Sequence, residues 1–490
     1  MNYKLISRIF ALILVLEAIF MLPAIVIAAC FDPLNVTLSF LISMGITLGG
    51  AGLFALFSIK AKKGFYAKEG LVCVSLSWIL MGLFGALPFF LSGAIPNYVN
   101  ALFEIVSGFT TTGASILSEI ESLPKSVLYW RSFSHWIGGM GVLVFLLAIV
   151  PLSGRNDGFT IHLLRAESPG PDVGKLRPRM RQTALILYAT YIVLTILDFG
   201  FLAAGGLNPF DALCTAFGTA GTGGFAIHND SLAGFTPYLQ NVCSVFMFLF
   251  GVNFSCYFLL LLRHFKAVFK DEELRLYILT VVISIAIITI NIRNLPGMDS
   301  IWDALRHSAF QVTSIISTTG YSTVDFNAWP ALSKSILVVL MVTGACAGST
   351  CGGMKCVRIL LLFKGMKRNI SKMIHPQKVQ PIRSGDKVVS EEIMANTNAY
   401  LSAYVIILAL SCVVISADPG NFSFTTNFTA VVACFNNVGP GLGLVGPMGN
   451  YGDFSIVSKL VLILDMLAGR LEIFPILMLI GSGFGLRKKS

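Results

Sequence analysis

Long apolar runs recur along the whole chain, and they constrain its fold more than any other feature. Crossing the hydrocarbon core of a membrane takes about 20 residues of α-helix. Runs of suitable length lie near 5–29, 35–58, 70–93, 127–150, 183–205, 237–262, 275–292, 332–362, 399–417 and 456–482. Because 55% of the residues are apolar and 12% are charged, a soluble enzyme, a disordered chain and a nucleic-acid-binding domain are excluded. The sequence predicts an all-α polytopic membrane protein.

The first apolar run allows two interpretations. Lys4 and Arg8 precede it and Cys30 follows it, as in a lipoprotein signal with its cleavage box. However, the run is longer than the roughly 7–15 apolar residues of a signal peptide, and it matches a membrane-spanning helix in length. We therefore favour an uncleaved first transmembrane helix.

Basic side chains predict the orientation of the chain. The sequence carries 35 Lys and Arg against 25 Asp and Glu. When the N-terminus is placed inside, most of the basic residues fall in the predicted cytoplasmic connections, as the positive-inside rule requires. We therefore expect both termini in the cytoplasm, and the net charge of +10 requires no nucleic acid partner.

Four further apolar stretches are too short to cross a membrane. They lie near 99–111, 209–221, 301–318 and 425–437, and each ends in a polar turn that contains glycine. Backbone that enters a membrane without crossing it is tolerated only inside protein or beside a water-filled path. These stretches therefore predict re-entrant helices along a permeation pathway.

The four turns form an internal repeat. When Gly113, Gly223, Gly320 and Gly439 are aligned, the turns read Thr111-Thr112-Gly113, Gly221-Thr222-Gly223, Thr318-Thr319-Gly320 and Asn437-Val438-Gly439. Four copies of span, short helix, turn and span predict a pseudo-fourfold pore in one chain. The predicted units are an extra N-terminal transmembrane helix pair at 1–60 and pore repeats at 61–155, 156–265, 266–365 and 366–490.

The composition of the turns favours a site for a monovalent cation. Extended turns can supply backbone carbonyls that replace the ion's hydration shell, and the short helices would direct their partially negative C-terminal ends at the path. The turns contain no acidic residue, so K⁺ or Na⁺ is favoured over a divalent ion. The alternative is that the turns serve only close helix packing. Four aligned copies make this the weaker explanation.

A glycine-rich segment interrupts the second span of the third repeat. Residues 344–355 contain four glycines, and each glycine weakens a helix by about 1 kcal/mol. We interpret the segment as a mobile gate below the filter, and a tight helix-packing face is the alternative. The gate residues would be Gly344, Gly348, Gly352, Gly353 and Lys355.

Arg470 lies within the last span. An arginine at the centre of a membrane costs at least about 2.5 kcal/mol, so its side chain should face the protein interior. Its charge would form an electrostatic barrier in the cation path below the filter, and we count Arg470 with the gate. The alternative is a buried ion pair with Asp465 or Glu472.

The turns resemble those of the Trk/Ktr/HKT family of potassium transporters, and the resemblance covers nearly the whole chain. Ser134-His135-Trp136-Ile137-Gly138-Gly139-Met140-Gly141, after the first turn, also resembles this family. The family implies one ion path per chain, homodimers in a bacterial inner membrane, and a cytosolic nucleotide-binding regulator resembling TrkA. It also implies that Gly113 accompanies K⁺ selectivity. Docking of the regulator on the basic connections at 151–182 and 363–396 rests on the resemblance alone.

The expected function is gated K⁺ uptake, with Rb⁺ as a second permeant ion and no organic cofactor. Asn437 and Val438 depart from the threonine pairs of the first and third turns, so some Na⁺ passage is compatible with the sequence. A K⁺/H⁺ or K⁺/Na⁺ symporter could use the same filter, and the sequence does not separate it from a channel. A multipass membrane enzyme is disfavoured, because no catalytic constellation with suitable spacing is found.

Overall fold

The chain folds almost entirely into helices in the computed structural model, which describes residues 2–59, 67–141, 180–377, 379–385 and 387–483. A single short hairpin in this part pairs β1 (Arg383–Ser384) with β2 (Lys387–Val388) in antiparallel register. The predicted all-α architecture is confirmed. The boundary predicted at 155/156 and most of the connection at 151–182 lie outside the described residues.

Six segments of the described chain are helical, long and apolar enough to cross a membrane. They are α1 (Tyr3–Phe31), α2 (Leu34–Phe57), Glu69–Leu91 with α3 (Ala67–Gly85) and α4 (Leu87–Leu91), α9 (Met180–Ala204), α14 (Glu272–Ile292) and α18 (Glu391–Ser416). A bent pair, α11 (Pro237–Phe250) and α12 (Phe254–Leu261), would add a seventh. The protein is thus polytopic, and its described residues form fewer continuous spans than the ten predicted from the whole sequence.

Two predicted spans are wrong as continuous helices. Within 237–262 the axis turns by 88° between α11 and α12, because the Asn253 side chain accepts a hydrogen bond from the Ser255 amide and starts a new helix. Within 456–482, α20 (Ile456–Arg470) ends before α21 (Phe474–Gly483), and both Glu472 and Ile473 have positive φ. Pro475, the second residue of α21, is compatible with a new helix start at this second break.

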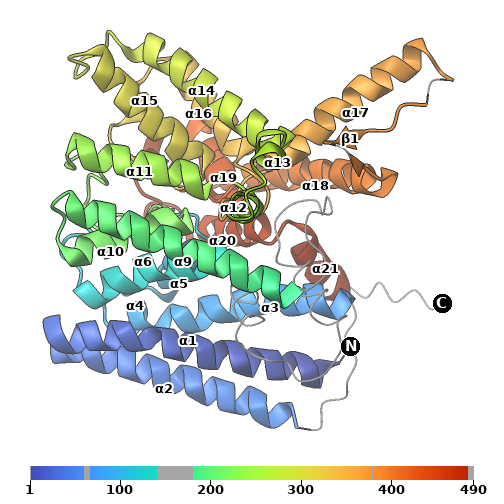
Figure 1. Ribbon diagram of the computed structural model, residues 1–490. Helices are drawn as coiled ribbons and strands as arrows, with labels where there is room; N and C mark the ends of the chain where they lie inside the picture. The colour runs from blue at the N-terminus through green and yellow to red at the C-terminus, as the bar shows by residue number, and fades with distance from the viewer. Residues whose placement is uncertain (1, 60–66, 142–179, 378, 386, 484–490) are drawn as a thin grey trace.

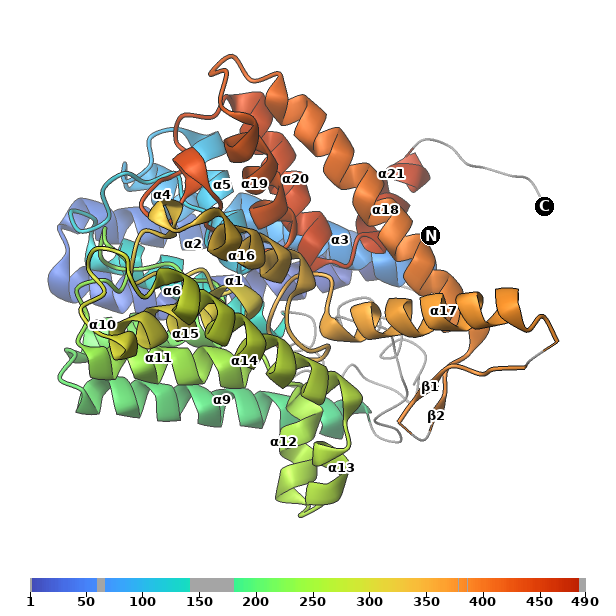
Figure 2. The same ribbon diagram turned by 90° about the horizontal axis from the view of Figure 1, so that it is seen from above.

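The break predicted within 332–362 lies between α16 (Ala331–Thr343) and α17 (Cys356–Ile374). Because α17 continues to Ile374, the first third of the connection predicted at 363–396 is helical. Figure 1 shows α17 extending away from the other helices, and Figure 2 shows α12 and α13 (Phe265–Phe269) projecting from another part of the same end. For the span predicted at 127–150, the structure describes only α6 (Lys125–Met140).

The four short apolar stretches form short helices, as the sequence predicts: α5 (Tyr98–Phe109), α10 (Pro209–Gly221), α15 (Ile301–Ile316) and α19 (Phe424–Phe435). Each begins at a residue whose side-chain oxygen accepts a hydrogen bond from a backbone amide of the first turn. These N-caps are Asn97, Asn208, Ser300 and Ser423. Such caps satisfy amides that would otherwise be unpaired at the helix start. Two 3₁₀ turns, η1 (Phe326–Ala328) and η2 (Gly443–Val445), complete the described elements.

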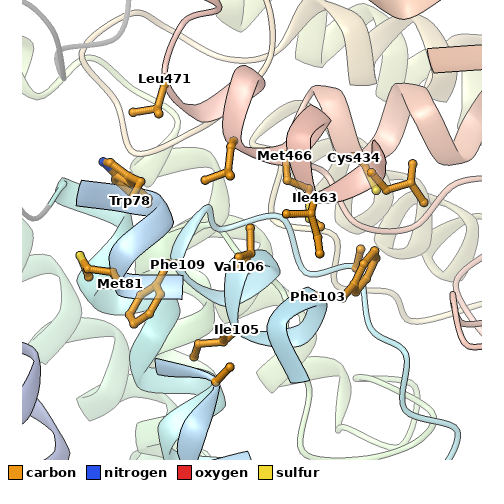
Figure 3. Packing of buried hydrophobic residues seen from close by; sticks show 14 of the residues in the cluster. Trp78, Met81, Phe103, Ile105, Val106, Phe109, Cys434, Ile463, Met466 and Leu471 are labelled. Atoms are coloured by element: carbon orange, nitrogen blue, oxygen red, sulfur yellow. The ribbon is translucent and has the colours of Figure 1, made fainter. Parts of the chain in front are cut away.

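The largest buried apolar cluster joins the N-terminal helices to the first and fourth short helices. Figure 3 shows Trp78 and Met81 of α3 beside Phe109 of α5, with Ile463 and Met466 of α20 on the other side of α5. The α1–α2 pair lies side by side along one edge of the molecule (Figure 1). This packing holds α5 between α3 and α20, and so fixes the turn that follows α5.

Asp418, in the connection between α18 and α19, fixes the start of α20. Its carboxylate accepts hydrogen bonds from the Ser455 amide, the Ser458 hydroxyl and the Gly420 amide. Burial by itself raises the pKa of Asp418, but these hydrogen bonds outweigh burial and hold the pKa at about 2. Because the folded-state pKa lies below the unfolded one, the stabilisation is complete above the unfolded pKa and is lost as the pH falls toward the folded pKa.

We predict that Asp418→Asn lowers the stability of the purified protein by about 1 kcal/mol at pH 7, the size of a carboxylate's effect at a helix N-terminus. The difference in Tm between wild type and variant should shrink as the pH falls from 5 toward 2. Thermal unfolding of both proteins in detergent at several pH values measures this difference in Tm. A difference that is the same at pH 3 and pH 7 would contradict the assignment.

Candidate functional site

The turns after the four short helices share one backbone conformation. Thr111, Thr222, Thr318 and Asn437 have φ of 54°, 55°, 56° and 55°. In each case this residue's amide bonds the carbonyl three residues back, and the next amide bonds the carbonyl five residues back. This is the Schellman arrangement, which usually places glycine at the left-handed position. Three threonines there are unusual, because a β-branched residue with positive φ is strained.

The shared conformation corrects the alignment of the second turn. Two residues after the left-handed position, Gly113, Gly224, Gly320 and Gly439 have φ of 78°, 73°, 86° and 95°. Gly224, and not Gly223, is therefore the structural equivalent of the other three glycines. By backbone geometry, the triplet Gly221-Thr222-Gly223 is displaced by one residue from the other three, and the equivalent triplet is Thr222-Gly223-Gly224. The second turn contains three glycines within four residues, at 221, 223 and 224. The residue types alone therefore do not decide which of them aligns with the glycines of the other turns.

The four glycines bring the turns into a closed ring. A Cβ atom built on Gly113 would overlap the carbonyl oxygen of Gly223, and one on Gly224 would overlap that of Thr319. A Cβ on Gly320 would overlap the carbonyl oxygen of Val438. One on Gly439 would lie 2.6 Å from the carbonyl oxygen of Thr112, which closes the circle. Each glycine thus leaves room for a carbonyl of the next turn.

A cavity of about 110 Å³ lies on one side of this ring. All four equivalent glycines line it, and Gly223 does not. No carboxylate lines this cavity, and the described part of the chain contains no group of three His, Cys, Asp or Glu residues suited to a metal ion. A ring of backbone carbonyls beside a cavity without carboxylates can dehydrate a monovalent cation.

The segment Ser134–Gly141, at the end of α6, braces the first two turns. The His135 Nε2 accepts a hydrogen bond from the Phe225 amide at 3.2 Å, so its Nδ1 carries the proton and donates to the Gly108 carbonyl at 2.9 Å. A Cβ atom on Gly138 would overlap the Phe109 carbonyl. The small residues of this segment therefore let α6 approach the backbone at the end of α5.

Hydroxyl and amide groups brace the other turns. The Tyr451 hydroxyl donates to the Gly439 carbonyl at 2.7 Å, and the Tyr321 hydroxyl lies 3.3 Å from the Phe225 carbonyl. The Asn437 amide donates to the Thr112 hydroxyl at 3.0 Å and to the Met466 carbonyl at 2.9 Å. Asn437, which departs from the threonines of the other turns, thus links the fourth turn to the first.

The glycine-rich segment 344–355 lies against the turns. Its Gly352 amide donates to the Thr318 hydroxyl at 2.7 Å, and a Cβ on Gly352 would lie 2.9 Å from the Cβ of Asn437. The Lys355 ammonium is buried and donates to the Cys351 carbonyl. Left-handed backbone at these positions explains why the helix stops: Gly344, Gly348, Gly353 and Lys355 all have positive φ.

Arg470 joins this segment to the first turn. Its guanidinium donates to the Thr350 carbonyl at 2.8 Å, to the Thr111 hydroxyl at 3.3 Å and to the carbonyls of Gly138 and Gly139. The two acids considered as alternative partners are engaged elsewhere. Glu472 pairs with Arg358, and Asp465 accepts a hydrogen bond from Ser411 at 2.7 Å. The arginine therefore places a positive charge beside the carbonyl ring and the glycine-rich segment.

A family model described as "TrkH: Cation transport protein" matches residues 42–482. The chain belongs to the TrkH family. The relatives include the "Trk system potassium uptake protein TrkH" of Halomonas elongata, 35% identical with 99% of each chain covered. The TrkH protein of Escherichia coli K12 is 35% identical with 98% of each chain covered. The crystal structure of the potassium transporter TrkH from Vibrio parahaemolyticus matches with a TM-score of 0.87 at 30% identity, over 99% of this chain and 100% of that one.

Membership of the TrkH family agrees with the polytopic helical fold and with transport rather than enzymatic activity. In this family member the structure brings together the predicted turn residues, the glycine-rich segment and Arg470. Sequence reasoning missed Gly224 and the bracing residues His135, Tyr321 and Tyr451. Of these, His135 lies in the segment whose resemblance to the family was noted, and that segment was the available signal.

Proposed function

We propose that this chain is the membrane subunit of a Trk potassium uptake system in a bacterial inner membrane, with both termini cytoplasmic. The observation that carries the proposal is the closed ring of four equivalent turns, in which each glycine accommodates the carbonyl of the next turn. The relatives named as potassium uptake proteins support K⁺ as the transported ion. K⁺ is the cargo, and Rb⁺ should follow the same path.

The ions would pass between four repeats, at 61–155, 156–265, 266–365 and 366–490, behind an N-terminal pair at 1–60. The filter would consist of Thr111 to Gly113, Thr222 to Gly224, Thr318 to Gly320 and Asn437 to Gly439. Their carbonyls would replace the hydration shell. The negative ends of α5, α10, α15 and α19 would favour a cation at the ring.

Residues 344–355 and Arg470 would close this path on its inner side. The Gly352 amide donates to the Thr318 hydroxyl, and Arg470 donates to both the Thr350 carbonyl of the segment and the Thr111 hydroxyl, which supports a segment held against the filter. Opening would require these bonds to break, and a cytosolic nucleotide-binding regulator resembling TrkA would supply the energy by binding α17 and the neighbouring basic connections. A homodimer in lipid is the proposed assembly. Coupled symport remains the alternative mode for the same filter.

Uptake of ⁸⁶Rb⁺ into K⁺-loaded proteoliposomes containing the purified chain tests the proposal. External K⁺ should inhibit this uptake at a concentration at least about tenfold lower than Na⁺, a difference of about 1.4 kcal/mol in binding. Liposomes without protein provide the background. Equal inhibition by the two ions would refute K⁺ selectivity, and uptake that appears only with the cytosolic regulator present would support the gate.

A further inference from the structure

Glu104 and Arg131 form a buried ion pair beside the carbonyl ring, and the filter and gate described above do not include either residue. The Arg131 Nε lies 2.8 Å from a carboxylate oxygen of Glu104, and the two side chains are 1% and 0% exposed. Glu104 belongs to α5 and Arg131 to α6, so the pair lies within the first repeat. Removing one partner of a buried ion pair strongly destabilises a fold, because it leaves the other charge buried and uncompensated. The pair therefore holds α5 and α6 firmly together beside the turns.

The carboxylate of Glu104 holds the chain that leaves the first turn. It accepts hydrogen bonds from the Ile116 amide at 3.0 Å and from the Ser115 hydroxyl at 2.9 Å. Ser115 follows Gly113 by two residues, so these bonds fix the direction in which the first turn exits. Because a backbone amide, a hydroxyl and the Arg131 guanidinium together bind both oxygens, the carboxylate has little freedom to move.

The guanidinium of Arg131 reaches from the first turn to the second. It donates to the Ala226 carbonyl at 3.1 Å and to the Ser115 hydroxyl at 3.4 Å, and it lies 4.1 Å from the ring centre of Phe225. Phe225 and Ala226 directly follow Gly224 in the second turn. Arg131 also lines the cavity beside the four glycines. The planar guanidinium can make these contacts simultaneously, whereas a lysine ammonium cannot.

The other repeats lack this arrangement. In α10, α15 and α19 the positions equivalent to Glu104, counted back from Thr222, Thr318 and Asn437, hold Thr215, Gln311 and Ala430. We propose that the Glu104–Arg131 pair is a positioning device that sets the distance between the first two turns, and thereby the preference of the ring for K⁺ over Na⁺. This inference rests on the proposed function, and it names residues that determine the selectivity of that site.

The test compares wild type, Arg131→Lys and a matched control, Arg306→Lys, by ⁸⁶Rb⁺ uptake with K⁺ or Na⁺ as competitor. Arg306 pairs with Asp303 at 2.9 Å on α15, where both side chains are partly exposed. Arg131→Lys should lower the ratio of the Na⁺ to the K⁺ inhibitory concentration by about tenfold, equivalent to about 1.4 kcal/mol. Arg306→Lys should leave the ratio unchanged. Size-exclusion chromatography and Tm establish that each variant is assembled.

The outcomes separate the two proposals. A wild-type protein without K⁺ preference would refute the proposed function itself. A wild-type preference that an assembled Arg131→Lys variant retains would overturn the positioning role alone. If Arg131→Lys does not assemble, Ser115→Ala replaces it, since this change removes one hydroxyl that contacts both members of the pair. For Ser115→Ala, the ratio of the Na⁺ to the K⁺ inhibitory concentration should fall about threefold, the effect of losing one hydrogen bond with a net contribution of less than 1 kcal/mol. An unchanged ratio would overturn the inference.

Discussion

Gly224→Ser should reduce K⁺-competed ⁸⁶Rb⁺ uptake by at least about tenfold, although the sequence alignment does not place Gly224 in the filter. A side chain at Gly224 would overlap the Thr319 carbonyl of the third turn. The backbone at Gly224 also has a φ of 73°. Holding a non-glycine residue in a left-handed conformation costs roughly 1–2 kcal/mol, and each 1.4 kcal/mol is a factor of ten. The overlap adds to this, because a backbone carbonyl cannot move unless its whole turn moves. Gly113→Ser should reduce this uptake to a similar extent, because Gly113 also has a positive φ and lies against a carbonyl of the next turn.

Gly49→Ser is the matched control for the glycine changes. Gly49 lies on the exposed face of α2, and a Cβ built on it has nothing within 4 Å. Its substitution should leave both uptake and the K⁺ to Na⁺ ratio unaltered. An assembled Gly224→Ser protein with wild-type uptake and selectivity would show that the fourfold ring is not the ion path.

Arg470→Gln should raise ⁸⁶Rb⁺ uptake in the absence of any regulator, by at least about tenfold for a barrier lowered by 1.4 kcal/mol. The substitution removes a positive charge beside the ring and weakens the hold on the Thr350 carbonyl. A charge in a low-dielectric path repels a cation far more strongly than it would in water. Flux through proteoliposomes measures the effect, and the elution profile of the purified protein establishes assembly.

Arg470→Lys separates the two contributions of the arginine. Lysine keeps the charge but lacks the planar guanidinium group that bonds the Thr111 hydroxyl, the Thr350 carbonyl and two carbonyls of α6 at the same time. If the charge forms the barrier, Arg470→Lys should keep uptake low while Arg470→Gln raises it. If the hydrogen bonds to the glycine-rich segment hold the gate shut, both variants should raise uptake. If the two variants assemble poorly but the assembled molecules carry the same flux as wild type, Arg470 has only a structural role.

Much of the fold follows from local features of the sequence. Apolar length identifies the spans, and the caps at Asn97, Asn208, Ser300 and Ser423 mark where the short helices begin, because these signals act within one turn of helix. The bends at Gly251 to Asn253 and at Leu471 to Ile473 were not predicted. At the second of them, Pro475 at the start of α21 is a signal that the sequence analysis did not use, since proline disfavours a helix that continues through the residues before it.

The sequence by itself determined that this chain is a helical membrane protein with four glycine-containing turns, because segment length and turn composition are properties of short stretches. Only the tertiary structure decided that Gly224 belongs to the ring, since three nearby glycines are equivalent until their backbone angles and neighbours are known. It also decided the partners of Arg131 and Arg470. Those contacts join residues far apart in the chain, and a charged group within a membrane protein takes its partner from the packing around it.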